Sequence, residues 1–293
     1  MAERGDKGWM MASEDQGGQR DPAVVGPVVP GPVGIDAYRP AEIAWRIENA
    51  GIAKTRLGLC PLVTLGCLAG VFIGFGALFY VAVLAGADPA HGPTRLAAAL
   101  AFSLGLILVI VGGAELFTGN ALLVMARVDG LISTRALLRN WGIVYVANFA
   151  GALALCGLVW LAGLHDAAPG AQAARMVAAK FQLSGMELLA RGVLCNALVC
   201  LAVWLSFAAH DVAGKILAII FPVSAFVVLG LEHSVANMFL LPFGLLAGAP
   251  GGIADVLRNL AWVSLGNIIG GAGGVALSYW AAYRVGVTRP PLP

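Results

Sequence analysis

Charged residues are scarce in this sequence. Only 12% of its 293 residues are Asp, Glu, Lys or Arg, while 59% are hydrophobic and the mean hydropathy is +0.86. Because soluble domains contain roughly a quarter of charged residues, this composition excludes a surface that water solvates on all sides. The net charge of +2 is small and gives no indication of a nucleic-acid partner. The composition predicts an integral membrane protein.

Residue types that bind metals or cofactors are also few. The five cysteines all lie in apolar stretches and none forms a Cys-x-x-Cys pair, which favours small buried hydrophobic residues over disulfides or metal ligands. Three of the four histidines, His91, His165 and His210, fall in predicted loops. No apolar run typical of a signal peptide precedes residue 50. We expect no metal site, no cofactor and no cleaved leader.

The composition changes along the chain. Residues 1–35 are rich in Gly, Pro and charge, so they predict a disordered tail. Residues 36–56 place apolar residues, Trp45 and Ile52 among them, on one helical face, which predicts an amphipathic helix at the membrane surface; a plain cytosolic linker helix is the alternative. Residues 57–284 are expected to form the membrane domain, and residues 285–293 a short cytoplasmic tail.

Six apolar segments follow the amphipathic region, each near or above the roughly 20 residues that a membrane span needs. Their limits are 57–86, 97–125, 141–164, 188–209, 216–247 and 261–283. The second and the fifth are too long for one straight crossing, and polar residues interrupt both of them. With both termini on one side, that side holds 13 of the 18 Lys and Arg residues. The positive-inside rule then predicts cytoplasmic termini and an inner-membrane location.

The two interruptions share a pattern. Gly113-x-Glu115-x4-Asn120 recurs 117 residues later as Gly230-x-Glu232-x4-Asn237. A second pattern, Asn-x7-Asn-x2-Gly from Asn140, recurs from Asn259 at an offset of 119. Three helices per repeat is an odd number, so the halves must enter the membrane from opposite faces. The expected fold is all-α, with two inverted three-helix repeats whose second and fifth helices are broken and a transport site near the midplane.

At these residues the sequence resembles the formate/nitrite transporter family. GAELFTGN (113–120) matches the first family signature, EHSVANMF (232–239) closely matches the second, and the likeness runs from about Ala41 to Arg284. The resemblance implies an aquaporin-like protomer, a homopentamer with one pore in each protomer, and passage of formate, nitrite or a similar weak-acid anion, as the neutral acid or with protons.

Pore residues come partly from chemistry and partly from the resemblance. His233 is the one histidine expected at membrane depth, where ionisable residues are costly and usually functional. Apolar walls favour the neutral imidazole, which can donate a hydrogen bond or a proton to an anion. The resemblance places Thr118 opposite His233, and it implies that Asn196 and Lys180 lie on the approach, with Lys180 in the outer vestibule.

The resemblance also implies apolar residues that gate the pore, and the repeat suggests residues that brace the broken helices. The implied gates are Phe102, Leu106, Phe117 and Phe226. Glu115 and Glu232 are expected to brace exposed backbone groups and a nearby lysine, with Asn120 and Asn237 in the same role. The family pairs the first-half glutamate with a lysine early in the first helix, whereas the repeat offset from Lys180 leads to residues 61–62, Pro and Leu. We therefore expect Glu115 to lack its basic partner, because Lys54 and Arg56 lie too far upstream.

The sequence leaves two alternative functions to consider. The anion could be hydrosulfide, lactate or another substrate of the same family, which the sequence alone does not distinguish. A membrane redox enzyme would need at least a pair of ligands within the membrane, and a single histidine disfavours it. We expect a transport protein and not an enzyme.

Overall fold

The computed structural model describes residues 37–88 and 91–285, and in these ranges the chain is helical without strands. The predicted tails, 1–35 and all but the first residue of 285–293, lie outside the described residues. The elements are α1 Pro40–Thr55, α2 Leu59–Leu84, α3 Gly92–Gly112, the 3-10 helix η1 Gly119–Leu123, α4 Val124–Val128, α5 Thr134–Leu161, α6 Ala168–Phe181, α7 Gly185–Ala208, α8 Val212–Val228, α9 Ser234–Leu246, α10 Ile253–Ile268, the π-helical turn η2 Ile269–Ala276 and α11 Leu277–Tyr283.

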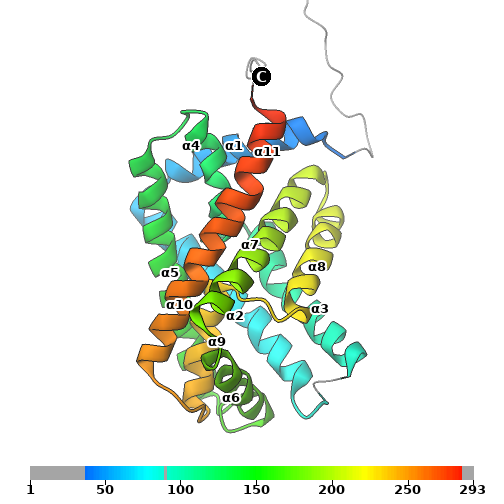
Figure 1. Cartoon of the computed structure of the whole chain (residues 1–293), viewed down its shortest axis with the longest axis vertical. Helices are drawn as coiled ribbons and strands as arrows, with labels where there is room; N and C mark the ends of the chain where they lie inside the picture. Colours follow the sequence, from blue (N-terminus) through cyan, green and yellow to red (C-terminus); the bar gives the residue numbers. More distant parts are fainter. Residues whose placement is uncertain (1–36, 89–90, 286–293) are drawn as a thin grey trace, which may run out of the picture. The chain divides into compact units, whose positions relative to one another are not determined.

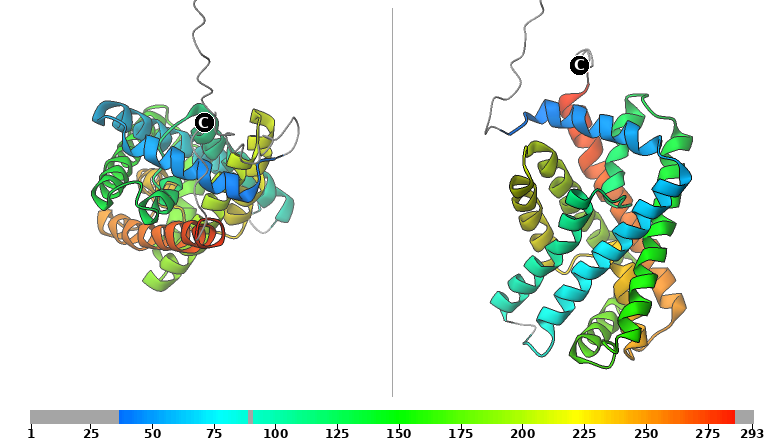
Figure 2. Two further views of the ribbon diagram at one scale, coloured as in Figure 1. Left: turned by 90° about the horizontal axis from the view of Figure 1, so that it is seen from above. Right: turned by 180° about the vertical axis from the view of Figure 1, so that it is seen from behind.

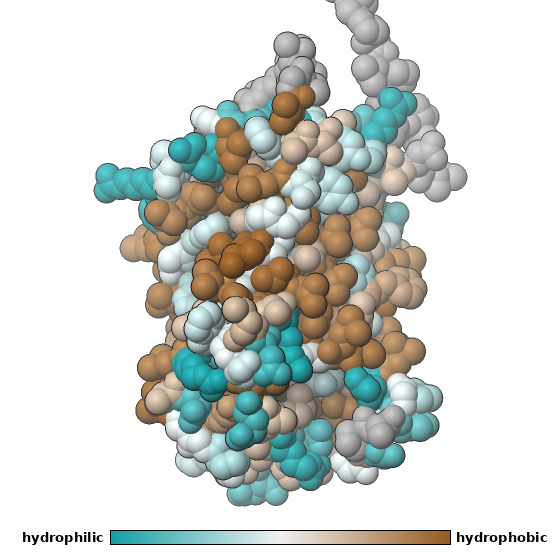
Figure 3. Space-filling model, in the orientation of Figure 1, coloured by the Kyte–Doolittle hydropathy of each residue, from teal (hydrophilic) through white to brown (hydrophobic). Residues whose placement is uncertain are grey.

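On the face shown in Figure 3, mostly hydrophobic side chains form a belt between two more polar ends. Large hydrophobic side chains within it face outward; Leu161 and Phe221 are more than 70% exposed. Among the described residues, five helical runs are long and apolar enough to cross a membrane: α2, α3, α5, α7 and the continuous run from α10 to α11. The predicted fifth segment, 216–247, is divided between the shorter α8 and α9. The sequence analysis did not anticipate α6.

Two polar breaks interrupt the apolar helices where the motifs lie. α3 is capped by Gly113, which adopts φ +80°, and helical structure resumes only at η1. α8 is followed by Gly230 at φ +67°, and the chain resumes at α9. A left-handed backbone favours glycine, so each motif begins with the residue that allows the turn.

The helices pack in two similar groups, α2 against α3 and α5, and α7 against α8 and α10 (Figures 1 and 2). The glycines of the repeated pattern permit the closest approaches. A Cβ atom at Gly151 of α5 would lie 2.0 Å from the carbonyl oxygen of Cys67 in α2. At Gly270, a Cβ atom would lie 2.0 Å from the carbonyl oxygen of Val193 in α7. Small residues let helix backbones meet in this way.

Helix α1 lies across one end of the other helices, called here the α1 end; the opposite end, which contains α6, is the α6 end (Figures 1 and 2). The apolar face of α1 buries Ile43 and Ile47 against Leu122 and Met125. A buried ion pair adds a polar anchor, since Arg284 Nε lies 2.9 Å from Glu48 Oε1.

The environment of this anchor perturbs its carboxyl groups. Burial raises the pKa of Glu48 to about 7, in spite of the opposing attraction of the Arg284 guanidinium. Burial also acts to raise the pKa of Asp129, but hydrogen bonds from Trp280, Glu48 and Arg284 hold it below its usual range. Since folded Glu48 holds its proton more tightly than the unfolded chain does, its contribution to stability is complete below the ordinary pKa of 4.5. That contribution is lost as the pH rises through about 7.

Replacing Glu48 therefore tests the anchor. We expect the melting temperature of the purified wild type to contain a component that declines between pH 5 and pH 8, and the Glu48→Gln variant to lose this component. The control is Glu42→Gln, in the exposed first turn of the same helix, where the carboxylate accepts from the backbone of Arg39. Equal pH profiles for the wild type and Glu48→Gln would contradict the assignment.

Candidate functional site

The two breaks meet deep inside the helices through one side-chain contact. Thr118 follows the first break and His233 precedes α9, and Thr118 Oγ1 lies 2.9 Å from His233 Nε2. Both residues are almost fully buried, at 1% and 4% exposed. This contact joins parts of the chain that are 115 residues apart.

Hydrogen bonding fixes the protonation pattern of the imidazole. The backbone N–H of Ala236 donates to His233 Nδ1 over 3.0 Å, so His233 caps the N-terminus of α9. A ring nitrogen that accepts carries no proton, and in a neutral ring the proton then lies on Nε2. Nε2–H donates to the hydroxyl oxygen of Thr118. Among the described residues this hydroxyl has no other side-chain or backbone partner, so its own hydrogen has no acceptor there.

A lysine, a glutamate and two asparagines form a buried cluster on the α1 side of the first break. Lys54 Nζ lies 2.7 Å from Glu115 Oε1 and 3.1 Å from Asn120 Oδ1. Asn120 Nδ2 donates to Glu115 Oε2 over 2.8 Å and to Asn140 Oδ1 over 2.9 Å. The carboxylate is thus neutralised and hydrogen-bonded on both oxygens.

The second break repeats this cluster. Lys180 Nζ lies 2.7 Å from Glu232 Oε1. Asn237 Nδ2 donates to Glu232 Oε2 over 2.7 Å and to Asn259 Oδ1 over 2.8 Å. These contacts match those of the first cluster except for the Lys54–Asn120 bond, since Asn237 Oδ1 has no hydrogen-bond partner among the described residues.

The expected absence of a basic partner for Glu115 was wrong. Lys54 is in the last turn of α1, as Lys180 is in the last turn of α6, so the amphipathic helix itself supplies the charge. Lys180 follows Lys54 by 126 residues, whereas Glu232 follows Glu115 by 117. The first half is longer between these points, so the shorter offset led to the wrong residues.

Two asparagines hold the backbone of the breaks. Asn148 Oδ1 accepts from Phe117 N over 2.9 Å, and its Nδ2 donates to the carbonyls of Gly66 and Glu115. Asn267 makes the same three bonds, to Ser234 N, Gly192 O and Glu232 O. The sequence analysis expected Glu115, Glu232, Asn120 and Asn237 to brace backbone groups and a nearby lysine; the two glutamates do bind lysines, whereas the backbone contacts belong to Asn148 and Asn267. The repeated Asn-x7-Asn-x2-Gly pattern was the signal for the true braces.

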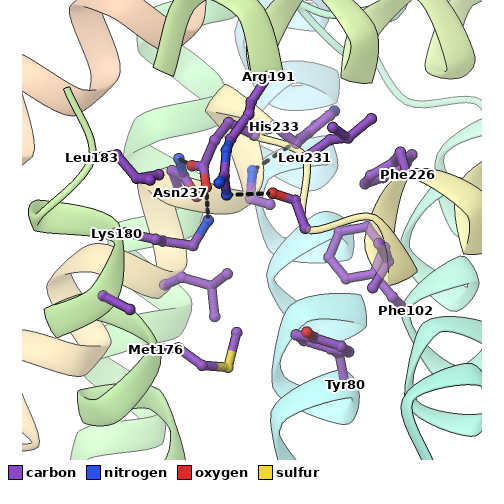
Figure 4. A pocket seen from close by; sticks show the side chains of 16 residues that line it. Tyr80, Phe102, Met176, Lys180, Leu183, Arg191, Phe226, Leu231, His233 and Asn237 are labelled. Carbon is purple, nitrogen blue, oxygen red and sulfur yellow. Dashed lines mark hydrogen bonds and ion pairs between the residues drawn. The ribbon is translucent and has the colours of Figure 1, made fainter. Parts of the chain in front are cut away.

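A cavity lies on each side of the Thr118–His233 contact. The cavity at the α6 end has a volume of about 370 Å³, and Lys180, Arg191 and His233 reach its wall (Figure 4). The cavity at the α1 end has a volume of about 390 Å³ and is lined by Lys54 and Glu115 among others. We call them the α6-end vestibule and the α1-end vestibule.

Apolar side chains border both vestibules, and His233 itself reaches the α6-end vestibule. Phe102 and Phe226 border the α6-end vestibule, with ring centroids 5.6 Å apart and nearly perpendicular planes (Figure 4). Leu106 borders the α1-end vestibule together with Leu116. Phe117 lines neither cavity, because its ring packs against Trp141 and Tyr145 of α5. Leu116, its neighbour, occupies the position that the sequence analysis gave to Phe117.

Asn196 likewise lines neither cavity. Its Nδ2 donates to the carbonyls of Thr118 and Asn267, so it joins α7 to the first break and to α10. Its Oδ1 is buried without a hydrogen-bond partner among the described residues. Lys180 does lie on the α6-end vestibule, as expected, but it is paired with Glu232.

An outward apolar belt, two polar breaks joined by a hydroxyl and an imidazole, and a cavity on either side define a membrane transport protein. A family model described as "Formate/nitrite transporter" matches residues 41–281. The chain belongs to the formate/nitrite transporter family.

Individual relatives agree with this assignment. The "Uncharacterized transporter YrhG" of Bacillus subtilis is 43% identical over 250 residues, which are 84% of this chain and 94% of the relative. "Formate channel FocA" of Escherichia coli K12 is 35% identical over 271 residues, covering 85% of this chain and 95% of the relative. A solved "Pentameric formate channel with formate bound" superposes with a TM-score of 0.69 at 33% identity, covering 77% of this chain and 97% of that structure.

The two bracing asparagines should matter equally for stability. Asn148→Leu and Asn267→Leu each leave one buried N–H and one buried carbonyl of a break without a partner, and each such group costs about 1–3 kcal/mol. We expect both variants to lower the melting temperature strongly and by similar amounts. The control is Asn49→Leu, a half-exposed residue of α1. An unchanged melting temperature for either buried variant would contradict the bracing role.

Proposed function

We propose that the chain conducts a small monovalent weak-acid anion, formate first of all, across the membrane. The observation that supports this most is the contact between Thr118 and His233, which presents one free hydroxyl hydrogen between two apolar constrictions. The named formate channels among the relatives supply the substrate class.

The hydroxyl of Thr118 can offset part of the desolvation cost of a passing anion. A bare anion loses several kcal/mol or more when it leaves water without replacement partners. Thr118 offers a hydrogen-bond donor that His233 polarises by donating to the same oxygen. One donor between apolar walls orients an anion without trapping it, so exit remains fast. Passage as the neutral acid would reduce the desolvation cost further.

The architecture that we propose is two three-helix repeats inserted in opposite directions. The matched clusters around Glu115 and Glu232 support it, since equivalent residues lie on the α1 side and on the α6 side. The distribution of Lys and Arg favours an inner membrane with α1 and both termini in the cytoplasm. Protease digestion of an N-terminal tag only in inside-out vesicles would agree; digestion only in right-side-out vesicles would contradict it.

We also propose a homopentamer, on the likeness to the pentameric formate channel. Native mass spectrometry should then give five times the chain mass of 30.1 kDa. A monomeric mass in a mild detergent would contradict this assembly.

Replacing the hydroxyl of Thr118 tests the central donor. Thr118→Val keeps the side-chain shape but removes the donor and leaves His233 Nε2–H without its acceptor. Because a lost hydrogen bond costs about 1–1.5 kcal/mol, we expect labelled-formate uptake into proteoliposomes to fall about tenfold. Thr118→Ser is the matched control and should keep most of the flux.

The same assay tests the substrate. Unlabelled nitrite, hydrosulfide and lactate are added as competitors at several pH values, and formate is expected to compete best. Absence of formate uptake by the wild type would contradict the proposed function, and full flux in Thr118→Val would contradict the role of the hydroxyl.

Removing the imidazole tests a proton-transfer role for His233. Asparagine is a favourable N-cap residue, so His233→Asn should keep the start of α9 while it removes the titratable ring. We expect the pH dependence of formate uptake to flatten or shift. The control is His91→Asn in an exposed loop, and an unchanged pH profile in His233→Asn would contradict proton transfer.

A further inference from the structure

Both vestibules contain cations without a carboxylate partner among the described residues, one (Arg191) at the α6 end and two at the α1 end. Lys180 in the α6-end vestibule is paired with Glu232, and the Arg191 guanidinium donates to the carbonyl of Gly230 over 3.2 Å (Figure 4). Lys54 in the α1-end vestibule is paired with Glu115 in the same way. The α1-end vestibule has two further cations in its lining, Arg46 and Lys215.

Neither of these cations has a carboxylate partner among the described residues. Arg46 follows Glu42 on α1, but the Glu42 carboxylate accepts from the backbone of Arg39. Lys215 lies one turn after Asp211, and that carboxylate caps α8 through the N–H of Gly214 over 2.7 Å. Glu42 and Asp211 are therefore committed to helix ends, and Glu48, the acid nearest to Arg46 in the sequence, is paired with Arg284.

Arg46 is nevertheless held in position. Its guanidinium carbon lies 3.4 Å from the ring centroid of Tyr38, a cation–π distance. Tyr38 in turn donates its backbone N–H to the carbonyl of Ala208 over 3.0 Å, and its ring lies 4.0 Å from that of His210. Stacking leaves the five guanidinium N–H groups free to bind an oxyanion.

The two cations lie on different walls of one cavity. Arg46 extends from α1 and Lys215 from the first turn of α8, and both line the same hollow as Leu106 and Leu116. Arg46 precedes Lys54 by eight residues, about two helical turns and about 12 Å along α1. An anion that enters this vestibule can thus meet cations without a carboxylate partner in addition to the paired Lys54.

We propose that Arg46 and Lys215 form an anion-binding subsite in the α1-end vestibule. It takes a small oxyanion, the carboxylate of formate in particular, before the anion reaches the constriction at Leu106 and Leu116. Unpaired cations in a cleft with low-dielectric walls concentrate anions from solution. Entry from the α1 end is then saturated at a lower formate concentration than entry from the α6 end. The inference rests on the proposed function and adds a direction-dependent property to it.

The test compares entry from the two ends. Initial rates of labelled-formate uptake are measured in inside-out and right-side-out vesicles, and protease access to an N-terminal tag shows which orientation presents α1. In the double variant Arg46→Gln, Lys215→Gln, we expect the half-saturating formate concentration from the α1 end to rise about tenfold, the lower bound for electrostatic steering. Entry from the α6 end should change by less than twofold, and Arg46→Lys with native Lys215 should keep most of the wild-type value.

Controls separate this subsite from general charge effects. Arg56→Gln removes a cation from the same helix that does not line the vestibule, and it should leave both half-saturating concentrations unchanged. Equal values for the wild type and the double variant at the α1 end would overturn the subsite while leaving conduction intact. Wild-type vesicles that take up no formate from either end would instead overturn the proposed function, and this inference with it.

Discussion

The structure depends on satisfying backbone groups where a helix stops inside the membrane. Hydrocarbon offers no hydrogen bonds, so non-helical backbone at that depth must find partners within the protein. Asn148 and Asn267 provide these partners, each with one acceptor and two donor contacts to the backbone of a break and of the neighbouring helix. An asparagine suits this task because its amide both donates and accepts without bringing a charge.

The same constraint explains why the glutamates do not repel an anion. A buried carboxylate needs a compensating cation and filled hydrogen bonds. Lys54 and Lys180 supply the charge, and Asn120 and Asn237 occupy the second carboxylate oxygen. At the Thr118–His233 contact, the hydroxyl hydrogen of Thr118 has no acceptor among the described residues. The pore therefore presents a weak donor to its ligand, and the strong charges are consumed in holding the frame.

The sequence predicted the breaks well because glycine, glutamate and asparagine have specific uses at membrane depth. It also predicted that Thr118 and His233 meet, through the family resemblance. The sequence analysis missed Lys54 because it applied one offset to the whole repeat. The chain between the lysine and the glutamate is longer in the first half than in the second. The sequence analysis failed at Phe117 as well. The segment 113–118 is not helical, so no periodicity indicates which side chain faces the cavity, and Phe117 turns toward α5 while Leu116 faces the vestibule.

The two halves of the chain have the same contacts where asparagines brace the backbone of the breaks, and they differ in the side chains at the mouths of the vestibules. Every contact of Asn148 has its counterpart at Asn267, because the N–H and the carbonyl of each break would otherwise be unpaired in a low-dielectric interior. The mouths are under no such requirement, since water solvates their side chains. Arg46 and Lys215 lie at the α1-end mouth, whereas Arg191 at the α6-end mouth is bound to a backbone carbonyl. A symmetric frame with unequal mouths need not saturate at the same anion concentration from each end.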